Sequence, residues 1–277
     1  MDFKIIDEII LNALKEDMPK GDITTDNLIP ENHTSKARFV CKEDGVISGT
    51  EVVRRVFELV GGDFNLSFNV KNGDHVKKGD IIGLIDGQTR TLLKGERVAL
   101  NLFQRMCGIA STTSKFTKEL VGHTKILDTR KTTPNLRYIE KMAVVDGGGT
   151  NHRYSLSDMA MIKDNHIVAA GSITKAVEIL KSKITQKVEV EVETREEFHE
   201  ALATDADIIM LDNMSNEDML YCVKHNDPSK HKLEASGNMT VERIKEVSKL
   251  GVDFISVGAL THSPKALDIS LKFYDLK

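Results

Sequence analysis

The chain of 277 residues has no tryptophan, only five prolines and only three cysteines. Cys41, Cys107 and Cys222 lie far apart, which argues against a disulfide framework and a cysteine-rich zinc site and fits a reducing compartment. No window approaches the roughly 18 consecutive apolar residues that a membrane-spanning helix needs. The first apolar stretch carries acidic residues, unlike a signal peptide. We therefore expect a soluble, cytoplasmic protein that does not enter a membrane.

An excess of positive charge is also missing, because 38 Lys and Arg residues face 42 Asp and Glu residues. This balance argues against general nucleic-acid binding, which requires a basic footprint. The distribution is uneven, however: residues 94–163 contain 12 basic and 6 acidic residues, and the remainder contains 26 and 36. Few aromatic side chains are present to stack on bases, so the basic segment favours a small polyanionic ligand. A solvated basic face is the alternative.

The first part of the chain mixes helical and strand-like patterns. Residues 4–16 place their apolar side chains on one helical face, and residues 37–94 contain short alternating runs broken by glycine turns. The apolar spacing over 95–121 predicts a long buried helix. We expect an N-terminal α+β sandwich domain over residues 1–105, with a C-terminal helix over 263–277 packing back on it.

The second part of the chain repeats a strand and a helix at intervals of 21 to 24 residues. Such repeats imply a parallel sheet with right-handed crossovers. Polar residues stand at the carboxyl ends of the predicted strands, where barrel enzymes place catalytic groups: Arg130, Lys163, Glu191, Asp212, Ser236 and Gly258. We therefore favour an incomplete α/β (TIM-like) barrel over residues 106–262. A doubly wound open sheet, whose site is fed by fewer strands, is the alternative.

Two segments, TRKTTPNLR at 129–137 and GGGTNHR at 147–153, concentrate groups that bind anions. Guanidinium and ammonium groups hold carboxylates and phosphates, and consecutive glycines let the backbone approach a ligand closely. The donors in these segments are Arg130, Lys131, Arg137, His152 and Arg153. A cluster of cations is costly unless an anion or acidic side chains offset it, so their density predicts an anion-binding pocket. Taken singly, Arg137 fits a surface residue as well as a ligand contact.

Acidic residues follow on the next strands. The run at 188–193 alternates Val and Glu, so we expect the valines to pack against the helices while Glu189, Glu191 and Glu193 face the barrel interior or its mouth. Glu191 and Asp212 are candidate ligands for Mg²⁺, which usually takes one or two carboxylates plus substrate oxygens. An ion-pair lattice with Lys131 and Lys163, without a metal, is the alternative, and we favour it for Glu189.

The late strands and the long helix offer further anion sites. Ser236 and Gly237 lie between a strand and a helix opened by Thr240, where unpaired backbone N–H groups attract anions. Gly258 ends the following strand, and loops on two late strands match the phosphate site common in barrels. A tight turn without a ligand is the alternative. Arg97 is expected at the start of the long helix, where a cation opposes the helix dipole, and we expect it to face a bound anion or a partner subunit.

A series of motifs runs through the chain in a fixed order: GERVALNLFQRMCGIAS, LDTRKTTP, GGGTNHR, MIKDNH, VEVEVET, LDN, LEASGN and SVGALTHS. In these motifs the chain resembles the quinolinate phosphoribosyltransferase family, also called carboxylating nicotinate-nucleotide pyrophosphorylases. GDITTDNLIP and GVISGTE also fit, so the resemblance covers nearly the whole chain. It implies a helix-and-sheet sandwich followed by an incomplete α/β barrel, assembled as at least a dimer.

The resemblance implies a pentosyltransferase that moves phosphoribosyl from phosphoribosyl pyrophosphate to the ring nitrogen of quinolinate. Loss of pyrophosphate and CO₂ would give nicotinate mononucleotide for NAD biosynthesis. The implied quinolinate-binding residues are Arg97 from the neighbouring subunit, Arg130, His152, Arg153 and Lys163. Those for phosphoribosyl pyrophosphate are Lys131, Glu191, Asp212, Ser236, Gly237 and Gly258. The implied catalytic residues are Lys131, Lys163, Glu191 and Asp212, of which Glu191 and Asp212 serve Mg²⁺.

Asn135 and Asn238 stand where family members often have glycine.

Three other functions remain open. A related pyrophosphorylase could act on another acceptor, and a barrel enzyme could use Lys163 to form a Schiff base. The segment KNGDHVKKGDIIGLIDG resembles a lipoyl-type carrier hairpin in its turns, but it lacks the modified-lysine turn. Departure of pyrophosphate needs charge stabilisation more than a protein nucleophile, and no nucleophile–His–acid arrangement stands out.

Overall fold

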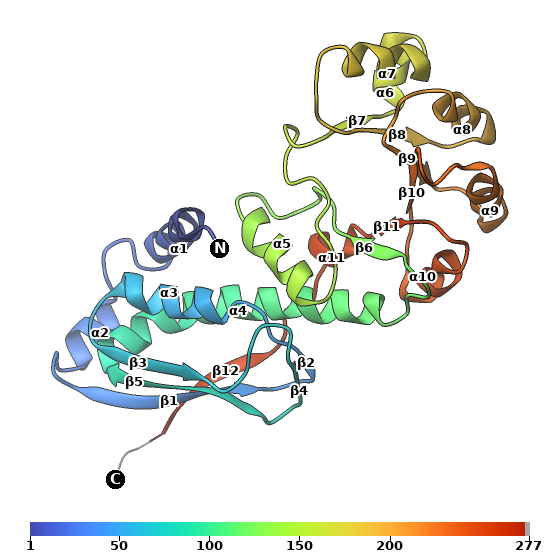
Figure 1. Cartoon of the computed structure of the whole chain (residues 1–277). Coiled ribbons are helices and arrows are strands. Elements are labelled where there is room, and N and C mark those ends of the chain that lie inside the picture. Colours follow the sequence, from blue (N-terminus) through green and yellow to red (C-terminus); the bar gives the residue numbers. More distant parts are fainter. Residues whose placement is uncertain (275–277) are drawn as a thin grey trace. The chain divides into compact units, whose positions relative to one another are not determined.

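The computed structural model describes residues 1–274 and forms two compact units, which we describe separately (Figure 1). Unit 1 comprises Met1–Ser114, Thr132–Gly148 and Leu260–Lys277, and unit 2 comprises Lys115–Lys131 and Gly149–Ala259. This division differs from the single cut expected between residues 105 and 106. Within the described residues, no helix combines the length and apolar character needed to cross a membrane.

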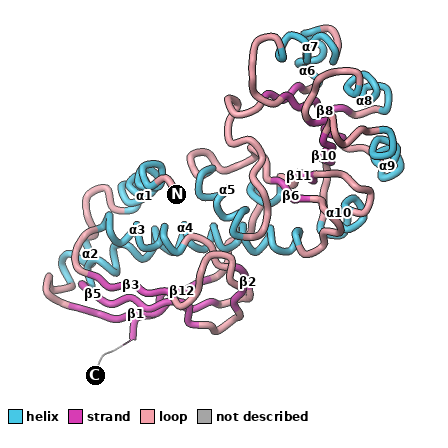
Figure 2. The backbone as a smooth tube through the Cα atoms, in the orientation of Figure 1, coloured by secondary structure: helices cyan, strands magenta, loops and turns pink. Residues whose placement is uncertain are grey.

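Unit 1 is built on a four-stranded antiparallel sheet in the order β12-β1-β5-β3 (Figure 2). Its strands are β1 (Thr34–Cys41), β3 (Phe64–Phe68), β5 (Ile81–Gln88) and β12 (Ile269–Tyr274). A two-stranded sheet pairs β2 (Gly45–Val46) with β4 (His75–Val76). The helices are α1 (Phe3–Asp17), α2 (Ile23–Leu28), α3 (Thr50–Val60), α4 (Thr89–Thr117) and α5 (Arg137–Asp146). The predicted opening helix is confirmed as α1, which buries Ile6, Ile9, Ile10 and Leu14.

The predicted C-terminal helix is wrong. Residues 269–274 form β12, which pairs with β1 and sets Leu271 opposite Phe39. Ile269 and Leu271 are buried at a spacing of two residues, which is the period of a strand and not of a helix. The segment thus completes the sheet of unit 1. The last part of the predicted helix, residues 275–277, lies outside the described residues.

The long helix α4 begins at Thr89, earlier than the predicted start at residue 95. Gly95 lies inside it, and a Cβ there would come within 2.7 Å of the Phe57 ring of α3. The glycine therefore permits close packing of two helices and does not mark a helix end. As a consequence, Arg97 is the ninth residue of α4, and the expectation that it opposes the dipole at the helix start is wrong.

Unit 2 contains a six-stranded parallel sheet in the order β6-β11-β10-β9-β8-β7. All six strands were expected from the sequence: β6 (Lys125–Leu127), β7 (Ala160–Ile162), β8 (Val188–Val192), β9 (Ile208–Asp212), β10 (Lys232–Ser236) and β11 (Phe254–Ser256). In the described residues β6 and β7 are the two edges and do not pair with each other, so the barrel is incomplete. The predicted fold class, an N-terminal α+β unit and a parallel α/β unit, is confirmed.

Helices connect these strands, and Figure 1 shows α7 to α10 along one side of the sheet. They are α6 (Asp164–Ala170), α7 (Ile173–Lys181), α8 (Arg195–Leu202), α9 (Asn216–His225) and α10 (Val241–Ser248). The short α11 (Ala259–His262) follows β11, and its residues 260–262 belong to unit 1. Hydroxyl side chains cap four of them by accepting a backbone N–H in the first turn: Ser172, Thr194, Ser215 and Thr240. These caps fix where each helix begins, and hence how long each loop at the strand ends can be.

Candidate active site

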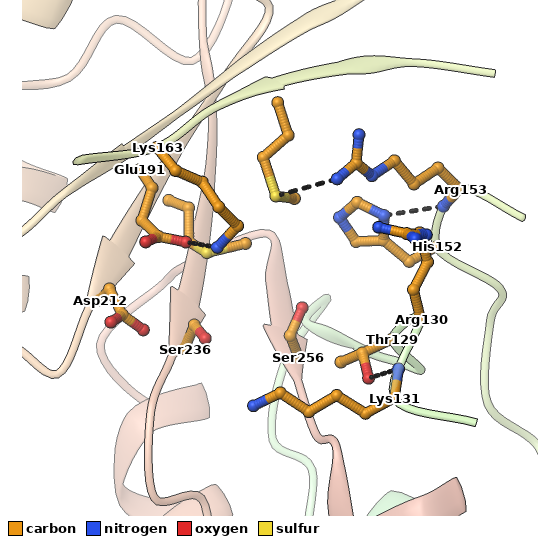
Figure 3. Close-up of a pocket in the computed structure, with 12 residues that line it drawn as sticks. Thr129, Arg130, Lys131, His152, Arg153, Lys163, Glu191, Asp212, Ser236 and Ser256 are labelled. Carbon is orange, nitrogen blue, oxygen red and sulfur yellow. Dashed lines mark hydrogen bonds and ion pairs between the residues drawn. The ribbon is translucent and has the colours of Figure 1, made fainter. Parts of the chain in front are cut away.

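A cavity of about 360 Å³ opens at the carboxyl ends of the strands of unit 2 (Figure 3). It is lined by Thr129, Arg130, Lys131, His152, Arg153, Met161, Lys163, Glu191, Met210, Asp212, Ser236 and Ser256. All twelve belong to unit 2. The structure therefore brings together eight of the residues expected at the site. Arg97, Gly237 and Gly258 are not among the lining residues.

One wall of the cavity is cationic and carries Arg130, Lys131 and Arg153 (Figure 3). The loop with Arg153 is tied to β6, because the Thr150 N–H donates to the Ile126 carbonyl at 2.9 Å. The Arg153 guanidinium donates to the Met159 carbonyl, also at 2.9 Å. Burial and the neighbouring charge of Arg130 lower the pKa of Arg153. Two guanidinium groups that repel each other in a partly buried wall are stabilised when an anion binds between them.

The opposite wall combines a lysine with acidic side chains from the ends of successive strands. The Lys163 ammonium forms an ion pair with the Glu191 carboxylate, and Asp212 and Ser236 follow on β9 and β10, where they are direct neighbours in the sheet. His166 accepts the Lys163 backbone N–H at 3.0 Å through Nδ1.

Left-handed backbone conformations occur in the loop that follows Ser236 in unit 2 and, separately, at Asn135 in unit 1. Gly237 has φ +92°, and a Cβ there would meet Asn213 Oδ1 at 2.1 Å, so only glycine fits. Asn135 (φ 66°) and Asn238 (φ 48°) adopt the left-handed conformation that glycine would take, which asparagine tolerates better than most residues. The loops thus keep a glycine-like backbone at both positions. Arg243 joins two of these loops by donating to the carbonyls of Gly237 (3.2 Å) and Met214 (3.0 Å).

Two expected anion-binding residues lie elsewhere. Arg97 is exposed on α4 of unit 1. Arg137 also belongs to unit 1, where its Nε donates to Thr132 Oγ1 at 3.0 Å. Arg137 is not among the residues that line the cavity.

Sequence reasoning missed Thr129, Met161, Met210 and Ser256. Three of them lie on a strand two residues before an expected site residue, namely before Lys163, Asp212 and Gly258, which end the strand or follow it within two residues. Alternate residues of a strand face the same side of the sheet. Counting back two residues from each expected site residue at a strand end would therefore have identified these three positions.

His152, which lines the cavity, lies beside two buried glutamates. His152 Nε2 lies 3.1 Å from Glu189 Oε2 and 3.4 Å from Glu234 Oε2, and both glutamates have no exposed surface. Burial and the neighbouring Glu234 raise the pKa of Glu189. Burial opposes a charge on His152, but the two carboxylates outweigh it and raise its pKa to about 10. Glu189 therefore belongs to a buried cluster with His152 and Glu234, and not to an ion-pair lattice with Lys131 or Lys163.

Comparisons with known proteins show which family this chain is similar to. Residues 22–107 match a family model described as quinolinate phosphoribosyl transferase, N-terminal domain, and residues 109–272 match the C-terminal domain model. The chloroplastic nicotinate-nucleotide pyrophosphorylase (carboxylating) of Arabidopsis thaliana is 43% identical over 284 residues, which covers 95% of this chain and 81% of that protein. Quinolinate phosphoribosyltransferase (decarboxylating) 1b of Nicotiana tabacum is 42% identical over 284 residues, which again covers 95% of this chain and 81% of that protein. The crystal structure of NadC from Streptococcus pyogenes has a TM-score of 0.94 and 41% identity, covering 99% of both chains.

Proposed function

The chain belongs to the quinolinate phosphoribosyltransferase family, and on this premise we propose that it transfers phosphoribosyl from phosphoribosyl pyrophosphate to the ring nitrogen of quinolinate. The products are nicotinate mononucleotide, pyrophosphate and CO₂, which places the enzyme in NAD biosynthesis. The observation that carries the proposal is the division of one cavity into a cationic wall and a wall of acids with a lysine. Such a cavity accepts a dicarboxylate beside a phosphorylated sugar.

The cationic wall orients the acceptor. Arg130 and Arg153 hold the carboxylates of quinolinate, because a guanidinium presents paired donors that match a carboxylate. Lys131 and Lys163 stand near the donor and the reacting carboxylate, where their charge stabilises the departing pyrophosphate. The C–O bond at the sugar breaks, the N–C bond forms, and the ring nitrogen becomes positive. That charge accepts the electron pair released with CO₂, and a proton from water replaces the lost carboxyl.

Glu191 and Asp212 fit a magnesium site by the chemistry of their donors. They present carboxylate oxygens at the mouth of the cavity, beside the Ser236 hydroxyl, and Mg²⁺ prefers one or two carboxylates completed by substrate oxygens. Bound there, the ion would neutralise charge on the pyrophosphate. The same carboxylates accept hydrogen bonds from the ribose hydroxyls, while the loops at Ser236, Gly237 and Gly258 face the 5′-phosphate.

We also infer a homodimer or higher oligomer in which Arg97 of one copy serves the cavity of another. Arg97 is an exposed cation, and it belongs to unit 1, whereas all residues that line the cavity belong to unit 2. The three buried cysteine thiols are compatible with a cytoplasmic location.

The other candidate functions gain no support from the structure. A Schiff-base lysine works as a neutral amine in an apolar pocket, whereas Lys163 is ion-paired with Glu191. The carrier-like hairpin has structural turns, because Asp74 and Asp80 accept the backbone N–H of Lys71 and Lys77, each at 2.8 Å.

The proposal is tested by comparing quinolinate with nicotinate as the acceptor, each with and without Mg²⁺. We expect product only from quinolinate with Mg²⁺ present. Equal or faster turnover of nicotinate would contradict the proposed acceptor and favour the related pyrophosphorylase.

A further inference from the structure

His152, Glu189 and Glu234 form a buried cluster that the reaction as described above does not use. The His152 side chain is 6% exposed and the two glutamates are fully buried. The neighbours of Glu189 in the sheet are Met161 and Ile208, which carry no charge. Glu234 lies between Met210 and Phe254 and accepts a hydrogen bond from the Ser256 hydroxyl. His152 Nε2 lies at ion-pair distance from both carboxylates, 3.1 Å from Glu189 and 3.4 Å from Glu234, and the charge of Arg153 also acts on Glu189.

The hydrogen bond that His152 accepts at Nδ1 shows which ring nitrogen carries the proton. The Arg153 backbone N–H donates to His152 Nδ1 at 2.7 Å, an interaction drawn as a dashed line in Figure 3. A nitrogen that accepts a hydrogen bond carries no proton, so in the neutral ring the proton must lie on Nε2, between the carboxylates. The two carboxylates favour a charged ring, which also has a proton on Nε2, but only the neutral ring can accept the Arg153 N–H, so the contact at Nδ1 assigns the neutral form. The cluster resembles a metal site, since its three ligand atoms lie within 4.8 Å of one another. A metal, however, needs the lone pair of Nε2, which this proton occupies.

The same contacts fix the loop that carries Arg153. The His152 backbone N–H donates to Asp128 Oδ1 at 2.8 Å, and the Arg153 N–H is held by the ring. Through Nε2 the ring is held in turn by Glu189 of β8 and Glu234 of β10. The loop that carries Arg153 therefore contacts β8 and β10, two interior strands of the sheet, through the His152 ring. Nδ1 accepts the Arg153 N–H and Nε2 lies beside the two carboxylates, so neither ring nitrogen is directed at a ligand.

We propose that Glu189 and Glu234 are positioning residues, which hold His152 by its Nε2 proton and thereby aim Arg153 at a carboxylate of the acceptor. His152 is then a link between the sheet and the loop, and not the direct quinolinate ligand that the family resemblance implies. This inference rests on the proposed function, because it assigns the acceptor to the Arg153 side of the cavity.

The first test uses the unmodified protein. In ¹⁵N spectra of histidine-labelled protein, the His152 signals are assigned by their absence in His152→Gln. We expect Nε2 to carry a proton throughout the neutral pH range and to be unchanged by excess Zn²⁺ or by EDTA. An unprotonated Nε2, or a His152 signal that moves with Zn²⁺, would overturn the inference and favour a metal site. This result does not depend on which acceptor the enzyme uses.

The second test separates positioning from general stability. Glu189→Leu should raise KM for quinolinate about tenfold while leaving KM for phosphoribosyl pyrophosphate within about twofold, because a misaimed Arg153 affects one substrate. Glu189→Gln should recover most of this loss, since its amide oxygen still accepts from Nε2. The matched control is Glu193→Leu at an exposed position just after the same strand. An unchanged quinolinate KM in folded Glu189→Leu, or equal rises for both substrates, would overturn the inference; if that variant does not fold, the spectra decide.

Discussion

The two walls of the cavity are built in different ways. The cationic wall stands on loops: Arg130 and Lys131 follow β6, and Arg153 lies on the segment before β7. The acidic wall stands on strand ends, since Glu191 and Asp212 belong to β8 and β9 themselves. A strand end is held by its neighbours, whereas a loop side chain needs additional contacts to keep its direction. The buried contacts of His152 supply them, which explains why buried acids lie beneath an anion-binding pocket.

The largest loss of activity is expected when a guanidinium group is removed from the cationic wall. Arg130→Ala should lower kcat/KM about a hundredfold or more, because a lost charged donor leaves an acceptor carboxylate unpaired. Steady-state kinetics with each substrate varied in turn would show the loss mainly against quinolinate. Arg137→Ala is the matched control and should stay within about twofold of the wild type. Near-normal turnover of Arg130→Ala would contradict the carboxylate clamp.

A change in the acidic wall should affect the other substrate. Asp212→Asn removes one of the two charges proposed to hold Mg²⁺, and we expect KM for phosphoribosyl pyrophosphate and the Mg²⁺ requirement to rise about tenfold. Titration of activity with Mg²⁺ measures both quantities. Asp205→Asn, at an exposed position, controls for the loss of one carboxylate. A rise in quinolinate KM alone would show that the walls are assigned the wrong way round.

A mixture of two inactive variants tests whether a second subunit contributes Arg97 to the cationic wall. Arg97→Ala and Lys163→Ala damage different sites, so a mixed dimer has one intact cavity and one doubly damaged cavity. We expect recovery of up to about one quarter of wild-type activity after subunit exchange, from random pairing in a two-fold dimer. No recovery, although exchange is demonstrated by differently tagged subunits, would contradict sharing.

The smallest effects are expected in the loops at the mouth. Asn238→Gly should change kcat/KM by less than about twofold, because both residues adopt the left-handed conformation found there. Gly237→Ala should be worse and should raise KM for phosphoribosyl pyrophosphate, since the added Cβ meets Asn213 and strains the backbone. The reverse ranking of the two variants would show that this loop does not face the donor.

Much of the mouth could be read from the sequence, because polar residues that end apolar strands at regular intervals must converge at one edge of a parallel sheet. Glu191, Asp212 and Ser236 were found in this way. The partners of His152 were not, since Glu234 lies inside a strand and only the parallel pairing of β8, β9 and β10 brings it to Glu189. The C-terminal strand was missed for a related reason. It pairs with β1, which lies more than two hundred residues earlier in the sequence, and a local sequence pattern does not indicate such a long-range pairing.

The central claim is that one cavity joins the two anionic reactants and couples phosphoribosyl transfer to decarboxylation. The most direct measurement follows CO₂ and pyrophosphate together from carboxyl-labelled quinolinate, phosphoribosyl pyrophosphate and Mg²⁺. The account predicts that both are released in equal amounts, and that neither is released when one substrate is left out. Release of pyrophosphate without CO₂, or of CO₂ without phosphoribosyl pyrophosphate, would contradict it.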